Sequence, residues 1–185
     1  MTKKIYYDWT QIEGACQEII RQICKTNWKP DYIVGLSRGG VIPATMLSHY
    51  LSIPMKPLMV NLRDHIECVS DTGMAEDAFG YSSEYSKTII EHDLFSNNNK
   101  KNILIVDDIN DTGATIEWIK KDWQNSCCPN SDVWPTVWNN NVRFAMLVNN
   151  AASQESIDYH CWDINKAYEN CWVVFPWENF WCKNL

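Results

Sequence analysis

The sequence predicts an α/β fold in which a mostly parallel sheet is covered by helices on both faces. Short apolar runs alternate along the chain with segments of helical pattern, and the apolar runs are continuous rather than broken by polar residues. Continuous apolar strands are typical of parallel sheets that are buried on both faces. No linker or internal repeat interrupts the 185 residues, so we expect one domain over residues 1–185.

The first element is expected to be an amphipathic helix. Thr10 and Glu13 fit a capping box, with Thr10 as the N-cap and Glu13 at the third helical position. The apolar residues that follow recur at helical spacing and predict a helix that ends near Lys25. These residues are Ile12, Cys16, Ile19, Ile20 and Ile23.

The next elements are two strands with a helix between them. Residues 32–36 form an apolar strand, and residues 41–50 predict a helix that tolerates Pro43 in its first turn. Residues 58–62 are a second strand candidate. Residues 63–95 have weak periodicity, and a long irregular segment in a compact domain is typically a functional lid or disordered.

The second half of the chain repeats the alternation. Residues 103–106 predict a strand, residues 114–122 a helix, and residues 143–148 a further strand. Residues 123–141 are interpreted as an inserted loop. Residues 171–175 are the last apolar run.

Composition and local pattern argue against several classes of function. The formal net charge of −7 disfavours binding to nucleic acid, which needs a positive surface. The N-terminus has no apolar core of a secretory signal, and no run of about 18 apolar residues predicts a membrane span. Without a signal, the eight cysteines are expected to stay reduced, and no CxxC pair indicates zinc. We therefore expect a cytoplasmic protein.

Three carboxylates stand beside a turn that is suited to an anion. Asp107 and Asp108 follow the apolar run, and Asp111 precedes the turn made of Thr112, Gly113, Ala114 and Thr115. Backbone N–H groups and the helix dipole favour a phosphate at the start of a helix. Carboxylates accept hydrogen bonds from sugar hydroxyls or hold Mg²⁺, so the pattern indicates a sugar phosphate. An alternative is that the acids only balance the positive end of the helix dipole. This alternative explains one acid well but three acids poorly.

A second unusual loop, Ser37-Arg38-Gly39-Gly40, follows the strand of residues 32–36. Ligands of open α/β sheets bind outside the carboxyl ends of the strands. Residues 106–115 (VDDINDTGAT) resemble the phosphoribosyl pyrophosphate (PRPP) motif of the type I phosphoribosyltransferases, and residues 35–40 (GLSRGG) resemble the pyrophosphate loop of that family. Residues 172–177 (WVVFPW) resemble the base-binding end of the bacterial xanthine–guanine branch, but residues 123–141 have no counterpart.

The resemblance implies roles for the PRPP-binding residues. Asp107 and Asp108 would bind the ribose hydroxyls, with Asp108 also near Mg²⁺, and residues 111–115 would surround the 5′-phosphate. The pyrophosphate would be held by Ser37, Arg38 and Gly39. The family often has a cis non-proline peptide in this loop, so the Ser37–Arg38 bond is a candidate.

The resemblance also implies a base site, a lid over residues 63–95 and a small hood built from the chain ends, about residues 150–185. Asp111 would face N7 of a purine and act as the general base. Trp172 would stack on the base, although a core tryptophan is an alternative, and Val173 would offer backbone groups to its edge.

The sequence departs from the family pattern at one point. The 6-oxopurine enzymes of the family usually place a lysine soon after the strand equivalent to residues 143–148, but this chain has Asn149, Asn150 and Ala151 there. The amide of Asn150 could bind the base, but it both donates and accepts. The choice between hypoxanthine, guanine, xanthine and even adenine therefore stays open.

The expected function is Mg²⁺-dependent transfer of the phosphoribosyl group from PRPP to a purine base, with nucleoside 5′-monophosphate and pyrophosphate as products. The expected partners are PRPP and a nucleobase, and the resemblance implies a homo-oligomer, a dimer or a tetramer. One alternative is transfer to another base, adenine or a pyrimidine. A second is a non-catalytic regulator that senses PRPP, which the acidic charge and the retained Asp111 disfavour.

Overall fold

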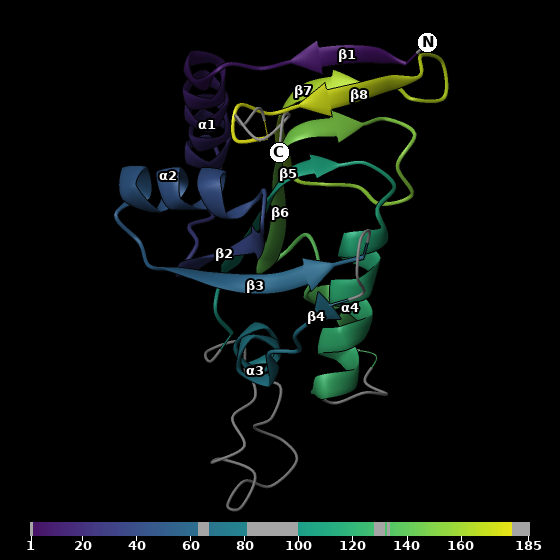
Figure 1. Cartoon of the computed structure of the whole chain (residues 1–185). Helices are drawn as coiled ribbons and strands as arrows, with labels where there is room; N and C mark the ends of the chain where they lie inside the picture. The colour runs from purple at the N-terminus through teal and green to yellow at the C-terminus, as the bar shows by residue number, and fades with distance from the viewer. Residues whose placement is uncertain (1, 63–66, 81–99, 128–131, 133, 179–185) are drawn as a thin grey trace, which may run out of the picture.

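The computed structural model describes residues 2–62, 67–80, 100–127, 132 and 134–178. Its larger sheet has six strands in the order β4-β3-β2-β5-β6-β7, and only β4 runs antiparallel to its neighbour (Figure 1). The strands are β2 (Tyr32–Ser37), β3 (Met55–Asn61), β4 (Glu67–Cys68), β5 (Ile103–Asn110), β6 (Val142–Asn150) and β7 (Tyr159–Ile164). The predicted mostly parallel sheet is confirmed.

A second, two-stranded sheet joins the two ends of the described chain. In it β1 (Lys3–Tyr6) runs parallel to β8 (Cys171–Val174), with Ile5 opposite Val173. Figure 1 shows this pair lying across one end of the larger sheet. The expected hood is therefore this pair of strands.

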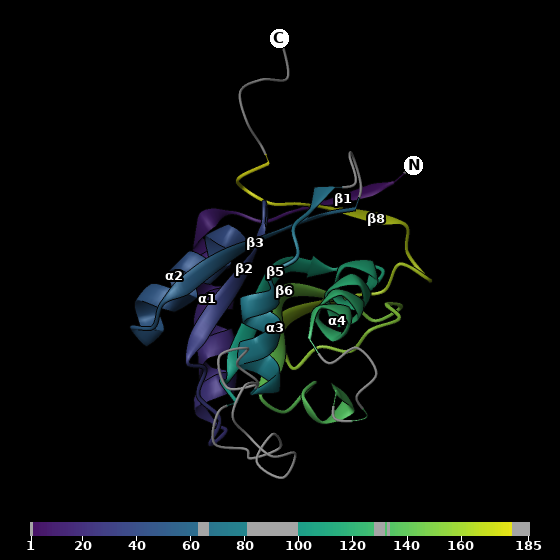
Figure 2. The same cartoon turned by 90° about the horizontal axis from the view of Figure 1, so that it is seen from below.

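Helices cover both faces of the larger sheet, as the continuous apolar strands predict. On one face lie α1 (Trp9–Cys24) and α2 (Val41–Leu51), and on the other lie α3 (Thr72–Phe79) and α4 (Ala114–Ser126) (Figure 2). None of the helices in the described residues is long and apolar enough to cross a membrane.

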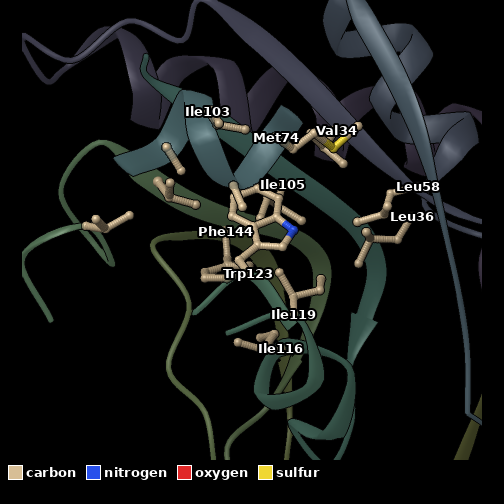
Figure 3. Packing of buried hydrophobic residues seen from close by; sticks show 14 of the residues in the cluster. Val34, Leu36, Leu58, Met74, Ile103, Ile105, Ile116, Ile119, Trp123 and Phe144 are labelled. Atoms are coloured by element: carbon tan, nitrogen blue, oxygen red, sulfur yellow. The ribbon is translucent and has the colours of Figure 1, made fainter. Parts of the chain in front are cut away.

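Alternate residues of one strand supply the cores on the two faces. Val34 and Leu36 of β2 pack in the cluster on the α3 and α4 side, whereas Ile33 packs in the cluster on the α1 and α2 side. Figure 3 shows the first cluster, where Trp123 of α4 lies against Phe144 and its neighbours on the sheet. Burial on both faces explains why β2 has no polar alternation.

The N-terminal cap of α1 differs from the prediction. Asp8, not Thr10, is the N-cap: its carboxylate accepts from the Gln11 backbone N–H at 2.8 Å. The Gln11 side chain in turn accepts from the Asp8 N–H at 2.9 Å. The capping box therefore lies two residues earlier than predicted, since an Asp–Gln pair satisfies the same end groups as a Thr–Glu pair. The predicted end of the helix is confirmed, because Lys25 is the C-cap.

Part of the segment over residues 63–95 is regular, so its prediction as irregular is wrong there. Asp71 caps α3 by accepting from the Met74 N–H at 2.9 Å, and Met74, Ala78 and Phe79 of this short helix are buried. The strand β4 precedes it. Residues 63–66 and 81–95 lie outside the described residues, and the lid stays a prediction.

The predicted inserted loop, residues 123–141, is partly core structure. Helix α4 continues to Ser126, and Trp134 opens a 3₁₀ turn with its side chain only 1% exposed. Trp134 contacts Phe79 and Trp138, with ring centroids 5.4 Å apart in both pairs. The described part of this segment therefore extends the core beside α3 and α4.

Besides β4, two further strands of the described residues were not predicted. The strand β1 is mostly exposed, and β7 mixes polar and apolar residues at the edge of the sheet, so neither gives a continuous apolar run. The predicted range of the hood began at about residue 150, but β7 joins the larger sheet instead. Assignment of residues 1–185 to one domain stays a prediction.

Candidate active site

The two loops singled out by the sequence meet at one edge of the sheet. They follow β2 and β5, which are parallel neighbours with Gly35 opposite Val106. A Cβ on Gly40 would lie 2.4 Å from the Val106 carbonyl oxygen, and a Cβ on Gly39 would lie 1.8 Å from Asp108 Oδ2. Residues 37–40 therefore lie directly against the end of β5, which only glycine allows at these two positions.

The first loop has the backbone geometry that the resemblance implies. Ser37 is the last residue of β2, and the peptide bond between Ser37 and Arg38 is cis, which confirms the expectation for this bond. Arg38 is exposed, while Gly40 is buried and begins the turn into α2. The cationic side chain of the loop is therefore accessible to a ligand.

The acid pair belongs to β5 itself, so the prediction that the strand stops at these acids is wrong. Asp107 pairs with Met146 of β6, and the pairing continues to Asn110. One Asp107 carboxylate oxygen accepts from the Asp108 N–H at 2.9 Å. Both carboxylates are half-buried at the strand end. The neighbouring strand β6 supplies the hydrogen bonds that extend β5 past its apolar run.

The donor set fits a magnesium ion that is shared with a substrate. Within the described residues no three His, Cys, Asp or Glu side chains gather into a metal site of their own. Mg²⁺ is commonly held by one or two carboxylates together with substrate phosphates. Asp108 lies against the loop of Ser37, Arg38 and Gly39, so its carboxylate is placed for such a shared ion.

The turn after Asp111 forms the N-terminus of α4. Gly113 is the N-cap and has φ of 89°, a conformation that favours glycine, and a Cβ there would also lie 3.0 Å from Glu155. Thr112 Oγ1 accepts from the Ala114 N–H at 3.3 Å. Thr112 and Ala114 are exposed, and Thr115 is half-buried. The start of this 13-residue helix therefore offers accessible backbone N–H groups to an anion.

Asp111 lies beside a lysine that the sequence analysis missed. Lys166 Nζ donates to Asp111 Oδ2 at 2.8 Å, and the two side chains are 23% and 21% exposed. Lys166 stands in the turn after β7, and β7 itself gave no strand signal. A basic residue between that edge strand and the predicted base-binding run was the available clue.

Asn150 is 5% exposed, and its amide atoms are bonded within the protein. Its Nδ2 donates to the backbone oxygen of Asp111 at 2.8 Å, and its Oδ1 accepts from the N–H groups of Ala152 at 3.1 Å and Lys166 at 3.0 Å. Asn150 therefore fixes the positions of Asp111 and Lys166 relative to each other. Its contact with a base stays a prediction.

A solvent-open cleft joins Asp111 to the hood. Trp172 is 48% exposed, and its ring centroid lies 5.9 Å from Lys166 Nζ, while the Val173 side chain is buried. The cleft is lined by Asp108, Ile109, Asp111, Lys166, Trp172, Val173, Phe175 and Glu178. The structure therefore brings the predicted base-binding residues Trp172 and Val173 to the predicted general base.

A larger hollow lies between β1, β8 and the start of α1. It is lined by aromatic residues such as Tyr7 and Trp9, and its one carboxylate, Asp8, is engaged as the helix cap. It contains neither an anion loop nor the acids of β5. The smaller cleft is therefore the better candidate for chemistry.

Comparisons with known proteins agree with this geometry. Residues 2–179 match the family model described as the phosphoribosyl transferase domain. A hypoxanthine-guanine phosphoribosyltransferase of Schizosaccharomyces pombe is 25% identical over an alignment 192 positions long, which covers 95% of this chain and 89% of the relative. A xanthine-guanine phosphoribosyltransferase of Idiomarina loihiensis is 20% identical over 177 residues, which cover 95% and 88%.

Solved structures agree as well. A purine phosphoribosyltransferase of Pyrococcus horikoshii matches with a TM-score of 0.61 and 26% identity, over 96% of this chain and 95% of that one. The Helicobacter pylori xanthine-guanine-hypoxanthine phosphoribosyltransferase matches with a TM-score of 0.63 over 97% and 95%, and its 19% identity supports the fold alone.

Proposed function

Because the chain belongs to the phosphoribosyl transferase domain family, we propose that it transfers the 5-phosphoribosyl group of PRPP to hypoxanthine, guanine or xanthine. The products are the nucleoside 5′-monophosphate and pyrophosphate, so the reaction serves purine salvage. One observation carries the proposal: Asp111 lies between the N-terminus of α4 and the cleft of Trp172. It directly follows β5, the strand whose Asp108 lies against Gly39.

The sugar phosphate is expected to bind along the end of β5. The carboxylates of Asp107 and Asp108 accept hydrogen bonds from the ribose hydroxyls, and the 5′-phosphate binds the N–H groups of residues 112–115. The pyrophosphate group binds the loop of Ser37, Arg38 and Gly39, where the guanidinium opposes its negative charge. The contact between Gly39 and Asp108 supports this order of groups, because it places the pyrophosphate loop beside the ribose acids.

When bound, Mg²⁺ would neutralise charge on the pyrophosphate leaving group. Asp108 is the residue that we expect to hold the ion together with oxygens of the substrate. The chain itself positions the two reactants. Trp172 orients the plane of the base by stacking, and the acid pair of β5 orients the ribose, so that the anomeric carbon faces the attacking nitrogen.

Asp111 is proposed as the general base. The bond between the anomeric carbon and pyrophosphate breaks, the bond to N9 of the purine forms, and Asp111 accepts the proton from N7. The carboxylate lies in the base cleft and its backbone carbonyl is fixed by Asn150, which supports this role.

We expect the reaction to take place in the cytoplasm, because Cys16, Cys24, Cys68, Cys161 and Cys171 are free thiols. A homo-oligomer, a dimer or a tetramer, is also proposed, and the exposed rings of Tyr6 and Trp9 support such an interface. Size-exclusion chromatography with light scattering tests this proposal.

The test of the function is nucleotide formation from PRPP and Mg²⁺ with hypoxanthine, guanine, xanthine, adenine, orotate and uracil. We expect product from the oxopurines, and a loss of about 10²- to 10⁴-fold in kcat for Asp111→Asn. Asp77→Asn is the matched control, because Asp77 is also 21% exposed and paired with a lysine, Lys101, at 2.7 Å. Saturable PRPP binding without product from any base would support the PRPP-sensing alternative instead.

A further inference from the structure

A short segment between β6 and β7 packs against the turn that is proposed to bind the 5′-phosphate. Its residues, Ser153, Gln154 and Glu155, are referred to as the brace. A Cβ on Gly113, the N-cap of α4, would lie 3.0 Å from the backbone nitrogen, the Cβ and the Cγ of Glu155. The brace is therefore in close contact with the start of α4.

One hydrogen bond from the brace orients a peptide group of this turn. The Gln154 backbone N–H donates to the Thr112 carbonyl oxygen at 3.2 Å. In a trans peptide, such as the one between Thr112 and Gly113, the C=O and the N–H point in opposite directions. Because the Thr112 carbonyl points to the brace, the Gly113 N–H points away from it. The brace therefore determines the side of the turn on which this N–H is available to an anion.

A buried amide fixes the brace to the end of β5. Asn110 is 2% exposed, and its Oδ1 accepts from Ser153 Oγ at 2.9 Å. Its Nδ2 donates to the Glu155 backbone oxygen at 2.8 Å and to Asn149 Oδ1 at 3.0 Å. Ser153 Oγ also accepts from the Glu155 N–H at 3.3 Å. A buried polar group is costly to leave unpaired, so these bonds hold the brace against the strand end.

An ion pair fixes the brace to α4 as well. Glu155 Oε2 lies 2.6 Å from Nζ of Lys120, in the second turn of the helix, and the side chains are 21% and 24% exposed. A partly buried pair is screened by salt less than an exposed one. The strand before the phosphate-binding turn, the turn itself and the helix after it are therefore all joined to the same three residues.

We propose that the brace orients the N–H groups of residues 112–115 before PRPP binds, and that Ser153 is a positioning residue of the phosphate-binding turn. The inference rests on the proposed function and deepens it by giving a role to a segment that does not line the cleft. Donors that are held in place beforehand lose less conformational entropy on binding. The loop that is proposed to hold pyrophosphate stands at the end of β2, so its affinity should not depend on the brace.

The test measures dissociation constants by calorimetry in the presence of Mg²⁺, with PRPP and pyrophosphate as the two probes. We expect Ser153→Ala to weaken PRPP binding about 2- to 13-fold, the range for one hydrogen bond, and to leave pyrophosphate binding unchanged. Ser153→Thr keeps the hydroxyl and should bind PRPP almost as tightly as wild type. Circular dichroism checks that each variant is folded.

Ser48→Ala is the matched control. Ser48 is also half-buried, and its Oγ donates to the Ile53 backbone oxygen at 2.6 Å near the end of α2, away from the brace. This variant should leave the affinity for both probes unchanged. Equal losses of PRPP and pyrophosphate affinity in Ser153→Ala would assign Ser153 a general structural role and overturn the inference. A loss in Ser153→Thr as large as that in Ser153→Ala would also overturn it.

The binding experiment contains no base, so its result does not depend on transfer. If Ser153→Ala selectively lost PRPP affinity but the wild-type chain formed no nucleotide with any base, the inference would be supported and the proposed function overturned. If the wild-type chain formed nucleotide but Ser153→Ala bound PRPP as tightly as wild type, transfer would be supported and the role of the brace overturned.

Discussion

The carboxylate of Asp108 occupies the space beside the Cα of Gly39, where an added Cβ would lie 1.8 Å from Oδ2 and 2.5 Å from Cγ. The two residues come from different strand ends, β2 and β5, that lie next to each other in the sheet. The contact joins the loop that is proposed to hold pyrophosphate to an acid that is proposed to hold ribose and Mg²⁺.

Replacement of Gly39 by alanine should therefore weaken PRPP binding while the fold remains. The new methyl group must displace the Asp108 carboxylate or the loop, so we expect the KM for PRPP to rise at least about 10-fold, equivalent to about 1.4 kcal/mol. Steady-state kinetics at saturating base measures this change, and circular dichroism checks the fold.

Gly14→Ala is the control for Gly39→Ala. Gly14 lies in α1, and a Cβ there would have no neighbour within 4 Å. Alanine should leave the kinetics unchanged and stabilise the helix by about 0.5–1 kcal/mol. If Gly39→Ala left the KM for PRPP unchanged, residues 37–40 would not belong to the proposed PRPP site.

Trp172→Ala should raise the KM for the base and leave the KM for PRPP near its wild-type value. Aromatic stacking contributes about 0.5–1.5 kcal/mol, so the expected rise is about 2- to 13-fold. Trp172→Phe should keep most of the affinity. The matched control is Trp9→Ala, because Trp9 is 54% exposed but lines the larger hollow. If Trp9→Ala raised the KM for the base instead, the larger hollow, and not the cleft of Trp172, would be the base site.

Asp158 predicts a pH dependence of stability. Its Oδ2 accepts from the Phe144 N–H at 2.8 Å, but burial raises the pKa of this carboxyl above its ordinary value of 3.8. A raised pKa means that the folded state holds the proton more tightly, so the contribution of Asp158 falls as the pH rises from 3.8 through the folded pKa. Each pKa unit is worth about 1.4 kcal/mol.

Asp158→Asn should remove this dependence, because asparagine stays neutral and can still accept from the Phe144 N–H. Urea unfolding between pH 3.5 and 7, followed by tryptophan fluorescence, compares the variant with wild type. We expect their difference to be smallest at the acidic end and to favour the variant as the pH rises. A difference that is constant across this range would contradict the assignment to Asp158.

Much of the fold was predictable because its central strands are buried on both faces. The apolar runs within β2, β5 and β6 can be recognised without knowledge of their partners, since burial on both sides leaves few polar positions in them. The strand β1 escaped prediction because three of its four residues are exposed, and its pairing with β8 depends on a contact between the chain ends. Such pairing is a tertiary effect that local pattern does not contain.

The residues of the candidate site also fall into those that the sequence predicts and those that it does not. The proposed PRPP-binding residues on and after β5 were predictable as a group, because they lie close together in the sequence: Asp107, Asp108 and residues 111–115. Lys166 was not, because its relation to Asp111 arises only when β7 lies beside β6 and the following turn folds back over the strand end. The buried bonds of Asn150 were equally inaccessible to the sequence, which shows an amide but not its partners.

The pairing of β1 with β8 also has a consequence for how the domain folds. Lys3, the first residue of β1, and Glu169, which precedes β8, form a salt bridge across 166 residues of sequence. Closing so long a loop carries a large entropic cost, and contacts of this kind form slowly compared with local ones. The part of the site that is proposed to recognise the base therefore forms only when the two ends of the described chain meet. The parts that are proposed to bind PRPP depend on segments that are much closer to one another in sequence.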